Sequence, residues 1–489
     1  MAFLDNIIIK TSLWSVRKVI RILFLALLGS ILIGITVFLL YMQSLPSLST
    51  WHTTKLENEF TQYSKVKDFN EYLVLEKRLF NEMDREIYDK VLPNEKNRIQ
   101  RYTRNSVSDP IHWENRWNKS FELSVDNPKM GILLLHGMSD SPYSLNTQAE
   151  YLHKKGVWVV SMRMPGHGTV PSGLRDVRWQ DMAKAVKIGM KRLSDKLGDK
   201  PIHIMGYSTG APLALNYTLS ALDDTSLRQP DRLIFYSPAV GVSKVAPLAI
   251  WQSRMGYFFG LPKLEWNSIV PEFDPFKYGS FAVNAGDQVY RLCNHIQERL
   301  DEYLSQEHNK QALPPILSFA SIVDSTVSVN DTVNKLYNRL PAGDHTLVLF
   351  DINHDFITDN LVKRQIVASL DTLRQVPQNI NYTFDLITDI NSTDSFVSLI
   401  RNGKNIEKLP YKWPKKLYSL SHLSLPITPY DPLYGNEHAP ESPGIQLGYL
   451  ALYGENSVLE TSAAALLRQR WNPFHSYIKQ RVLEFMELE

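Results

Sequence analysis

The sequence contains very little cysteine and carries almost no net charge. Its 489 residues include one cysteine, Cys293, which excludes an intrachain disulfide and a zinc cluster built on several thiolates. A net charge of +2 at pH 7 gives no indication of nucleic acid as a partner. With 44% hydrophobic and 21% charged residues, the composition is that of a globular protein long enough to bury a core.

Motifs for nucleotides and metals are lacking as well. The sequence contains no Gly-x-Gly-x-x-Gly fingerprint, no Walker loop and no His-Glu-x-x-His pair. We therefore expect neither a cofactor nor a metal ion, and we expect no nucleic-acid partner. No internal repeat or low-complexity tract is evident either.

A long apolar run without charge occupies residues 22–41. At about 1.5 Å per residue, a helix of roughly 20 residues spans about 30 Å, the thickness of the hydrocarbon layer of a bilayer. A buried core helix and a cleaved signal sequence are the alternatives. A signal sequence usually has an apolar region of only about 7–15 residues, so we expect an uncleaved membrane anchor over residues 22–42.

Basic residues are distributed unevenly around this run. Four of them precede it, and the first one after it is Lys55; the four are Lys10, Arg17, Lys18 and Arg21. The positive-inside bias then predicts a cytoplasmic tail over residues 1–21 and an extracytoplasmic position for the rest. In a bacterium the rest would lie in the periplasm, held at the inner membrane by a single span.

Residues 43–119 and 120–489 differ in pattern. The first range is charged and helix-like and predicts a helical stalk or linker packed on the core. From residue 120 apolar runs alternate with helical segments, which predicts an α/β fold with a mostly parallel sheet flanked by helices. The expected strands are 121–125, 131–135, 157–160, 202–205, 233–236, 316–320 and 347–350, and the expected helices include 144–155, 179–197 and 331–340. The alternation breaks over about 241–313, an aromatic-rich stretch that we interpret as a cap.

The strongest motif is Gly206-Tyr207-Ser208-Thr209-Gly210. It follows an apolar run and precedes a helical one, which places Ser208 at the apex of a strand–turn–helix. A Gly-x-Ser-x-Gly elbow needs small residues because neighbouring backbone approaches closely. The sequence thus predicts that Ser208 is a nucleophile, with a surface turn as the weaker alternative.

A serine nucleophile requires a histidine base and a carboxylate that orients it. Asp324 closes the apolar run 316–323 and lies in the order expected for the acid, after the serine. Two histidines compete for the base: His354 follows the strand 347–350, and His422 ends a plausible strand over 417–422. Spacing alone modestly favours His354.

Two backbone N–H groups are expected to form the oxyanion hole. One belongs to Thr209, directly after the nucleophile, and the other to Met138, in the loop after the strand 131–135. Gly137 permits this loop to turn inward. His136 precedes the serine in the chain, so we interpret it as structural, and the same holds for His167.

Three motifs together resemble the α/β-hydrolase superfamily. They are 133–137 (Leu-Leu-Leu-His-Gly), 165–168 (Pro-Gly-His-Gly) and the elbow 206–210, and they are most similar to the serine aminopeptidase-like, monoglyceride-lipase and lysophospholipase branch. The resemblance covers about residues 120–355 and implies the α/β-hydrolase fold with a helical cap. It is specific to the superfamily but not to a substrate.

A closer resemblance is to membrane-anchored bacterial α/β-hydrolases of uncharacterised substrate. The similar segments are 136–144, 273–278 and the pattern Ser-His-x-x-x-Pro…Asp-Pro-x-Tyr-Gly around His422. This resemblance implies that His422 is the base, with His354 as the alternative. It also implies that a C-terminal extension over about 381–489, with an extra strand at 381–387, completes the active site.

The predicted function is that of a membrane-anchored serine hydrolase that cleaves a carboxylic ester through an acyl-enzyme. The anchor and the aromatic cap favour a lipid-like or other apolar ester, and hence a carboxylesterase or lipase over a peptidase. A serine peptidase or amidase is the first alternative, because the same triad cleaves amides. A non-catalytic binding protein of the same fold is the second.

Overall fold

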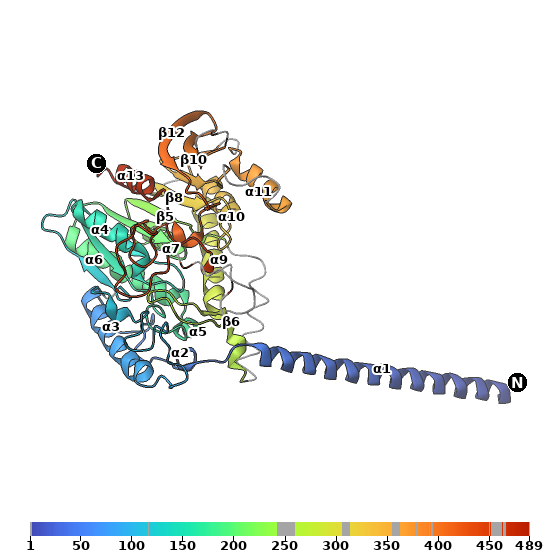
Figure 1. Cartoon of the computed structure of the whole chain (residues 1–489). Coiled ribbons are helices and arrows are strands. Elements are labelled where there is room, and N and C mark those ends of the chain that lie inside the picture. Colours follow the sequence, from blue (N-terminus) through green and yellow to red (C-terminus); the bar gives the residue numbers. More distant parts are fainter. Residues whose placement is uncertain are drawn as a thin grey trace. The chain divides into compact units, whose positions relative to one another are not determined.

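The computed structural model describes residues 2–115, 117–241, 260–305, 313–354, 362–376, 380–390, 392, 395–448, 450, 462 and 466–488. The chain divides into two compact units, Met1–Leu48 and Ser49–Glu489. The first unit is the helix α1 (Ala2–Ser44) (Figure 1). Its stretch Lys18–Ser44 contains an 18-residue window with a mean hydropathy of 2.8, and by length and composition it is able to cross a membrane. A signal sequence near an N-terminus has the same properties.

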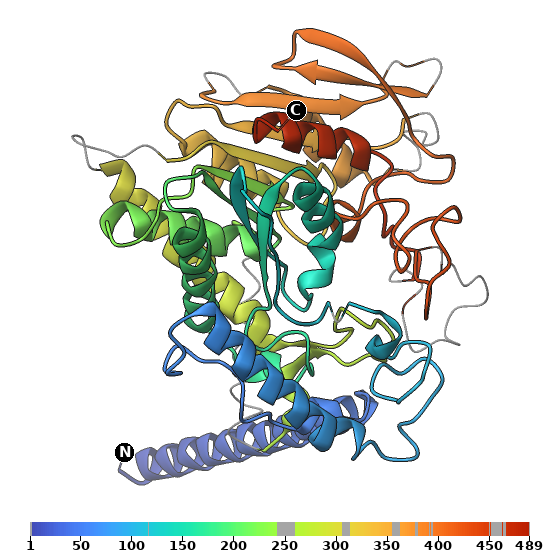
Figure 2. The same cartoon turned by 90° about the vertical axis from the view of Figure 1, so that its left-hand side faces the viewer.

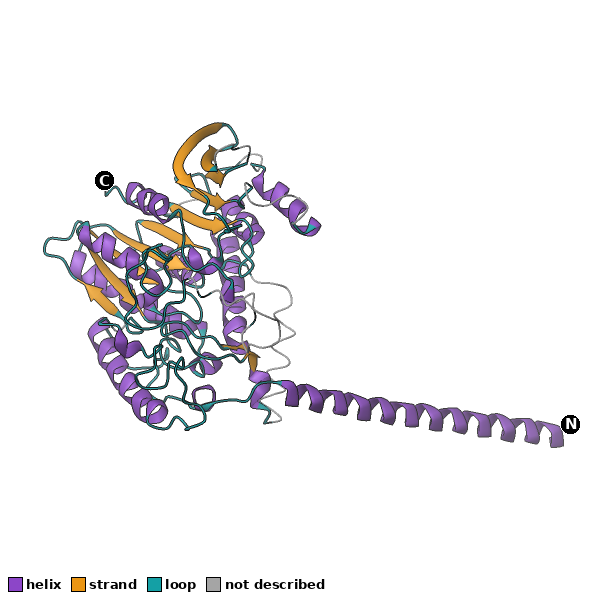
Figure 3. Ribbon diagram, in the orientation of Figure 1, coloured by secondary structure: helices purple, strands orange, loops and turns teal. Residues whose placement is uncertain are grey.

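The second unit is built on a ten-stranded sheet with the order β1-β3-β2-β4-β5-β8-β9-β10-β11-β12. Figure 3 shows the strands in orange, with helices packed around them. The strands from β3 to β10 are parallel, whereas β1, β11 and β12 pair antiparallel. Their bounds are β1 (Phe121–Leu123), β2 (Met130–Leu135), β3 (Val157–Met162), β4 (Ile202–Tyr207), β5 (Arg232–Tyr236), β8 (Ile316–Ser321), β9 (Thr346–Phe350), β10 (Thr383–Thr388), β11 (Phe396–Arg401) and β12 (Asn405–Lys412).

Helices cover both faces of this sheet, which explains the continuous apolar runs. Every residue of β2 is buried. A Cβ added at Gly131 would lie 2.2 Å from a methyl carbon of Leu197 in α6 (Trp179–Leu197), so one face of β2 packs against that helix. Ile132 and Leu134 belong to the core cluster on the other face, with α4 (Asn146–Lys154) and α13 (His475–Phe485). Strands buried on both faces are typical of parallel sheets.

The remaining helices are short or lie around this core. They are α2 (Thr50–Thr53), α3 (Phe69–Met83), α5 (Gly173–Asp176), α7 (Gly210–Asp223), α9 (Val283–Ser305), α10 (Val329–Lys335) and α11 (Arg364–Arg374). The small sheet of β6 (Trp266–Ser268) and β7 (Phe281–Ala282) precedes α9. Of the expected cap over 241–313, residues 242–259 and 306–312 lie outside the described residues.

The predicted mostly parallel sheet is confirmed, with differences at single elements. The helix 179–197 has the predicted bounds, whereas 331–340 divides into α10 and a 3-10 turn over Tyr337–Arg339. The expected strand over 417–422 is wrong. Its backbone oxygens at Leu417 and Tyr418 accept hydrogen bonds from the side chain and main chain of Asn353, so the segment is tied to a turn instead of a strand ladder.

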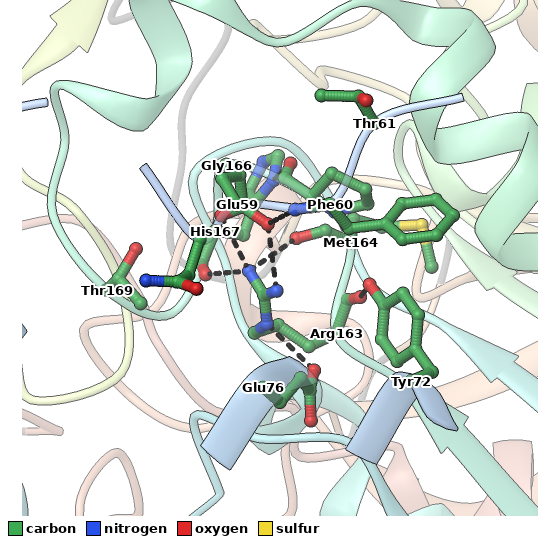
Figure 4. Close-up of polar contacts among 12 residues, drawn as sticks. Glu59, Phe60, Thr61, Tyr72, Glu76, Arg163, Met164, Gly166, His167 and Thr169 are labelled. Carbon is green, nitrogen blue, oxygen red and sulfur yellow. Dashed lines mark hydrogen bonds and ion pairs between the residues drawn. The ribbon is translucent and has the colours of Figure 1, made fainter. Parts of the chain in front are cut away.

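Within the second unit, a buried ion-pair network fixes the segment that follows residue 48 to the end of strand β3 (Figure 4). Arg163, directly after β3, donates to Glu76 on α3 at 2.8 Å and to Glu59 at 2.9 Å. The Arg163 side chain is fully buried. The hydroxyl of Tyr72 on α3 also donates to the Arg163 carbonyl oxygen, at 2.8 Å. Asp68 caps α3 by accepting from the Glu71 N–H. Buried charges need such partners, so this network fixes where the segment packs.

The C-terminal part of the chain extends the same sheet. Strand β10 pairs in parallel with β9, and β11 and β12 follow as an antiparallel hairpin, drawn in orange in Figure 2. Helix α13 places Tyr477, Ile478 and Val482 in the core cluster that includes Phe350 of β9. The ring centroids of Phe350 and Phe474 are 5.6 Å apart. Residues after 381 therefore share one core with the strands that precede them.

Candidate active site

Ser208 occupies a strained turn between β4 and α7. Its φ angle is +51°, a left-handed conformation that non-glycine residues rarely adopt. Its N–H donates to the Tyr236 carbonyl oxygen of β5 at 2.9 Å, which ties the turn to the neighbouring strand. A Cβ at Gly206 would lie 2.5 Å from the Gly210 carbonyl carbon, and one at Gly210 would lie 2.1 Å from the Leu135 oxygen. The two glycines are therefore required by backbone packing.

Asp324 and His422 form a direct pair at the carboxyl end of the sheet. The distance from His422 Nδ1 to Asp324 Oδ2 is 2.8 Å. Asp324 follows β8, and its other oxygen accepts from the N–H groups of Thr326 and Val327 at 2.8 and 3.0 Å. His422 begins a 3-10 turn over His422–Ser424 and is 4% exposed. Both side chains are shielded from water, which strengthens their interaction.

This environment keeps Asp324 in its charged form. Burial alone raises the pKa of a carboxyl, because it penalises the charge. Here the His422 imidazole and the hydrogen bonds to the carboxylate outweigh burial and hold the pKa of Asp324 below its usual value. A charged acceptor at Nδ1 fixes the imidazole tautomer with its proton on Nδ1, so that Nε2 becomes the basic nitrogen.

The His422 ring lies next to the residue that precedes the serine. The ring centroids of His422 and Tyr207 are 5.2 Å apart, and the Tyr207 hydroxyl donates to the His422 carbonyl oxygen at 3.4 Å. His422 therefore lies beside the elbow, in contact with Tyr207. An imidazole bound through Nδ1 presents Nε2 on the opposite edge of the ring, where a serine base needs it.

His354 has different partners. Its Nε2 lies 3.1 Å from Asp351 Oδ2 and 3.1 Å from the Arg374 guanidinium, and its N–H donates to Asp389. Asp351 is fully buried and also accepts from the Thr388 hydroxyl of β10. The structure therefore brings His422, and not His354, to Asp324. The extra strand β10 supplies part of the cluster that holds His354 elsewhere.

The loop after β2 approaches the serine closely. A Cβ at Gly137 would lie 2.6 Å from Asp140 Oδ2 and 3.0 Å from Ser208 Cβ, so a larger residue there would press on the nucleophile. Met138 follows in this loop and Thr209 follows Ser208, which puts both predicted oxyanion N–H groups on segments beside the nucleophile. His136 bonds to the Gly137 oxygen through Nδ1 and accepts from the Met164 N–H through Nε2. Burial lowers the pKa of His136 well below its usual value, which fits a neutral structural role.

A small cavity of about 30 Å³ borders the same segments. Its lining includes Tyr207 before the nucleophile, Leu423 after the histidine, and Asp140 two residues after Met138. The Lys277 ammonium donates to Asp140 at 2.7 Å. The other polar lining residues are Ser141, Tyr143, Ser144, Asp274, Tyr434 and Arg470.

Two of these lining residues come from motifs that the sequence analysis gave no role. The Tyr434 hydroxyl donates to Asp274 Oδ2 at 2.7 Å, which joins the segment 273–278 to the Asp-Pro-x-Tyr-Gly pattern. Asp431 of the same pattern accepts from the Tyr143 hydroxyl at 2.9 Å. Both motifs belong to the resemblance to membrane-anchored bacterial α/β-hydrolases, and this shared occurrence was the available signal that they act together. Arg470 left no signal, because nothing in its sequence context distinguishes it. In the part of the chain that the structure describes, no group of three or more potential metal ligands occurs.

The sheet order, the elbow and a family match define the class of protein. Residues 126–360 match the Hydrolase_4 family model, described as serine aminopeptidase, S33. The fold is that of an α/β-hydrolase, and the match over residues 126–360 is to the serine aminopeptidase-like branch of that superfamily. A curated relative is the thermostable monoacylglycerol lipase of Bacillus sp. (strain H-257), 31% identical over 91 residues. That alignment covers 19% of this chain and 36% of the relative, so the chain spans about a third of the relative's length.

Solved structures of lipolytic enzymes are similar at a low level. The metagenome-derived lipolytic enzymes LipS and LipT give 17% identity over 48% of this chain and 87% of the other, with a TM-score of 0.37. A soluble variant of monoglyceride lipase from Saccharomyces cerevisiae gives 15% identity over 47% and 82%, with a TM-score of 0.38. Likeness at this level says nothing of substrate.

Proposed function

We propose that the chain is a membrane-anchored serine hydrolase that cleaves carboxylic esters through an acyl-enzyme. The observation that supports it most is the Asp324–His422 pair beside the strained Ser208 elbow. In this proposal residues 120–489 form the hydrolase domain. Residues 43–119 link it to the anchor, the cap lies at about 241–313, and the extension from 381 completes the site.

Ser208 performs the first chemical step. Its Oγ attacks the ester carbonyl carbon while His422 Nε2 takes the hydroxyl proton. The carbonyl oxygen becomes an oxyanion held by the N–H groups of Met138 and Thr209. His422 then gives the proton to the alkoxide that leaves, and the alcohol departs from the acyl-enzyme.

Water completes the cycle by the reverse sequence. His422 takes a proton from water, hydroxide attacks the acyl carbon, and the bond to Ser208 Oγ breaks as Oγ regains the proton. Asp324 stays ionised throughout and stabilises the imidazolium that forms in each half-reaction. This role agrees with the direction of the pKa shift of Asp324, which favours its charged form.

Esters are preferred over amides in this proposal because the curated relative bears the name of a monoacylglycerol lipase. The family description, serine aminopeptidase, keeps amide hydrolysis as a second candidate, since the same groups cleave both bonds. Hydrolysis of an ethyl ester and of the matching amide by the same preparation distinguishes the two.

The apolar helix α1 supports the anchor in the proposal. With basic residues before the apolar run, the N-terminus lies in the cytoplasm and the hydrolase domain on the other side. The sequence gives Lys18 and Arg21 at the start of this run. Protease added to spheroplasts is expected to degrade the hydrolase domain, and protection until lysis would contradict this orientation. A mature chain that begins after Tyr41 would show instead that the segment is a cleaved signal.

Fluorophosphonate labelling tests the hydrolase proposal directly. The full chain is expected to be labelled and to hydrolyse short-chain esters, and Ser208→Ala is expected to do neither while keeping its fold. The matched control is a buried serine away from the elbow, Ser318→Ala on β8, which should be labelled like the wild type. Full activity of Ser208→Ala would reject the proposal.

A further inference from the structure

The cavity beside the proposed active site contains a buried arginine with unused donors. The Arg470 side chain is 9% exposed, and its nearest carboxylate oxygen, Asp274 Oδ2, is 3.7 Å away. That distance is too long for a hydrogen bond. Arg470 Nε has no hydrogen-bond partner among the residues that the structure describes. A buried charged donor without a partner is costly, which makes this arginine an exception that requires an explanation.

Asp274 does not take up these donors because it is already occupied. Its Oδ1 accepts from the N–H groups of Phe276 and Lys277 at 3.0 and 3.1 Å, and both oxygens lie within 2.8 Å of the Tyr434 hydroxyl. The guanidinium lies 6.0 Å from the ring centroid of Tyr434. Asp274 thus supplies a countercharge, whereas N–H groups of the Arg470 guanidinium stay available for another acceptor.

A second donor faces the same cavity. Ser141 is 1% exposed, lines the cavity, and its Oγ has no hydrogen-bond partner within the described part of the chain. Lys277 lines the cavity as well, although its ammonium is paired with Asp140. Two unpaired groups in this wall, Ser141 Oγ and Arg470 Nε, are therefore able to donate hydrogen bonds, and the arginine carries a positive charge. Such a wall complements an acceptor-rich anion.

The position and the size of the cavity limit its occupant. Its lining includes neighbours of the proposed nucleophile, base and oxyanion loop, namely Tyr207, Leu423 and Asp140. A volume of about 30 Å³ holds roughly two waters or one compact polar group, and it is too small for an acyl chain. The occupant is therefore a compact group that forms part of the substrate that reacts at Ser208.

We propose that this cavity is a subsite for an anionic group of the ester substrate, a carboxylate or a phosphate, held by Arg470 with help from Ser141. The inference rests on the proposed hydrolase function and specifies its substrate class. An arginine binds a carboxylate or a phosphate with two parallel N–H donors, which agrees with the choice of arginine over lysine here. The anion lies in the acyl part or in the alcohol part of the ester.

Two pairs of esters separate these two sources. Monoethyl succinate against ethyl butyrate tests an anion in the acyl part, and 1-butyrylglycerol 3-phosphate against 1-butyrylglycerol tests one in the alcohol part. The full chain in detergent is assayed by acid release at pH 7.5, as wild type, Arg470→Gln, Arg470→Lys and Ser141→Ala. Arg78→Gln, an exposed arginine on α3, is the matched control.

In one of the two pairs, the wild type is expected to have a higher kcat/KM for the anionic ester than for the neutral one. We call the quotient of these two kcat/KM values the anion preference. Arg470→Gln is expected to lower the anion preference by about 10- to 100-fold, because a hydrogen bond between charged groups is lost. The effect should lie mainly in KM, with the neutral ester within about twofold. Arg470→Lys should retain part of the anion preference, and Ser141→Ala should lower it by less than Arg470→Gln does. Arg78→Gln should leave it unchanged.

Three results would overturn the inference. A wild type without preference for either anionic ester would show that the cavity holds water only. An equal loss for neutral and anionic esters in Arg470→Gln would show a structural role. If Arg470→Gln does not fold, an unchanged anion preference in both Arg470→Lys and Ser141→Ala would count against it. In each case the wild type still hydrolyses neutral esters and is labelled at Ser208, whereas absence of both from the wild type would reject the hydrolase function itself.

Discussion

His422 Nδ1 and Asp324 Oδ2 lie 2.8 Å apart although 98 residues separate them in the sequence. Between the two, the chain forms β9, β10 and the hairpin β11–β12 before it returns to the carboxyl end of β8. The C-terminal part is therefore structurally necessary for this pair. Removal of the residues after 388 should abolish esterase activity as completely as loss of the serine.

Asp324→Asn tests the role of the carboxylate. An amide at this position has no charge to stabilise an imidazolium and allows the wrong imidazole tautomer. We expect kcat/KM for a short-chain ester to fall by about four orders of magnitude. Asp344→Asn, at an exposed aspartate before β9, is the matched control and should retain wild-type activity. Activity of Asp324→Asn within tenfold of wild type would contradict the assignment.

Asp431 is predicted to make stability depend on pH. Burial raises its pKa to about 6 from a usual value of 3.8. A carboxyl with a raised folded-state pKa stabilises the fold fully below its unfolded-state value, and this contribution is lost as pH rises through the folded-state value. The stability of wild type relative to Asp431→Asn should thus decline between about pH 4 and pH 6.

Chemical unfolding of both proteins in detergent at several pH values measures this difference. Asp344→Asn serves again as the reference, because it changes one exposed aspartate and should give a difference that does not vary with pH. A constant difference for Asp431→Asn over the same range would show that Asp431 ionises normally.

The Arg163 network is expected to be a large contribution to stability. The side chains of Arg163 and Glu76 are 0% and 2% exposed, so loss of one partner leaves the other charged and buried. Glu76→Gln should lower the free energy of unfolding by about 1.5–3 kcal/mol, because Arg163 loses a charged hydrogen bond but keeps its pair with Glu59. Asp195→Asn, which breaks the exposed pair with Lys191, should cost less than about 0.5 kcal/mol. Equal effects of the two changes would be inconsistent with the network.

Two glycine substitutions should have opposite effects. At Gly210 an added Cβ would lie 2.1 Å from a backbone oxygen of β2, so Gly210→Ala should prevent folding of the elbow and abolish activity. At Gly286 in α9 the nearest atom would be 3.8 Å away. Gly286→Ala should therefore raise stability by about 0.5–1 kcal/mol, as expected in an open helix position. Unfolding curves and ester assays of both variants check this.

Much of the sheet could be predicted because its strands are buried on both faces. Continuous apolar runs such as Ile316–Ser321 have few alternatives once helical segments flank them. The hairpin β11–β12 was not predicted, since its exposed charged positions, Glu407 and Lys408 among them, break the apolar pattern. The segment 417–422 was misjudged because its buried leucines pack on the core without a strand partner.

The candidate site could be predicted only in part. The elbow and Asp324 could be predicted from local patterns. The Gly-x-Ser-x-Gly motif marks the elbow, and the end of an apolar run marks Asp324. The choice between the two histidines depends on long-range topology, which spacing does not encode, and it came from family resemblance. Arg470 was missed because a buried arginine in a C-terminal loop has no local signature.

The most direct test of the account compares two single variants, His422→Ala and His354→Ala, in one ester assay with fluorophosphonate labelling alongside. The account predicts that His422→Ala loses about four orders of magnitude in kcat/KM, as expected for a triad member. His354→Ala should retain most activity, because its ring contacts Asp351 and Arg374 instead of the site. An inactive, folded His354→Ala together with an active His422→Ala would contradict the account.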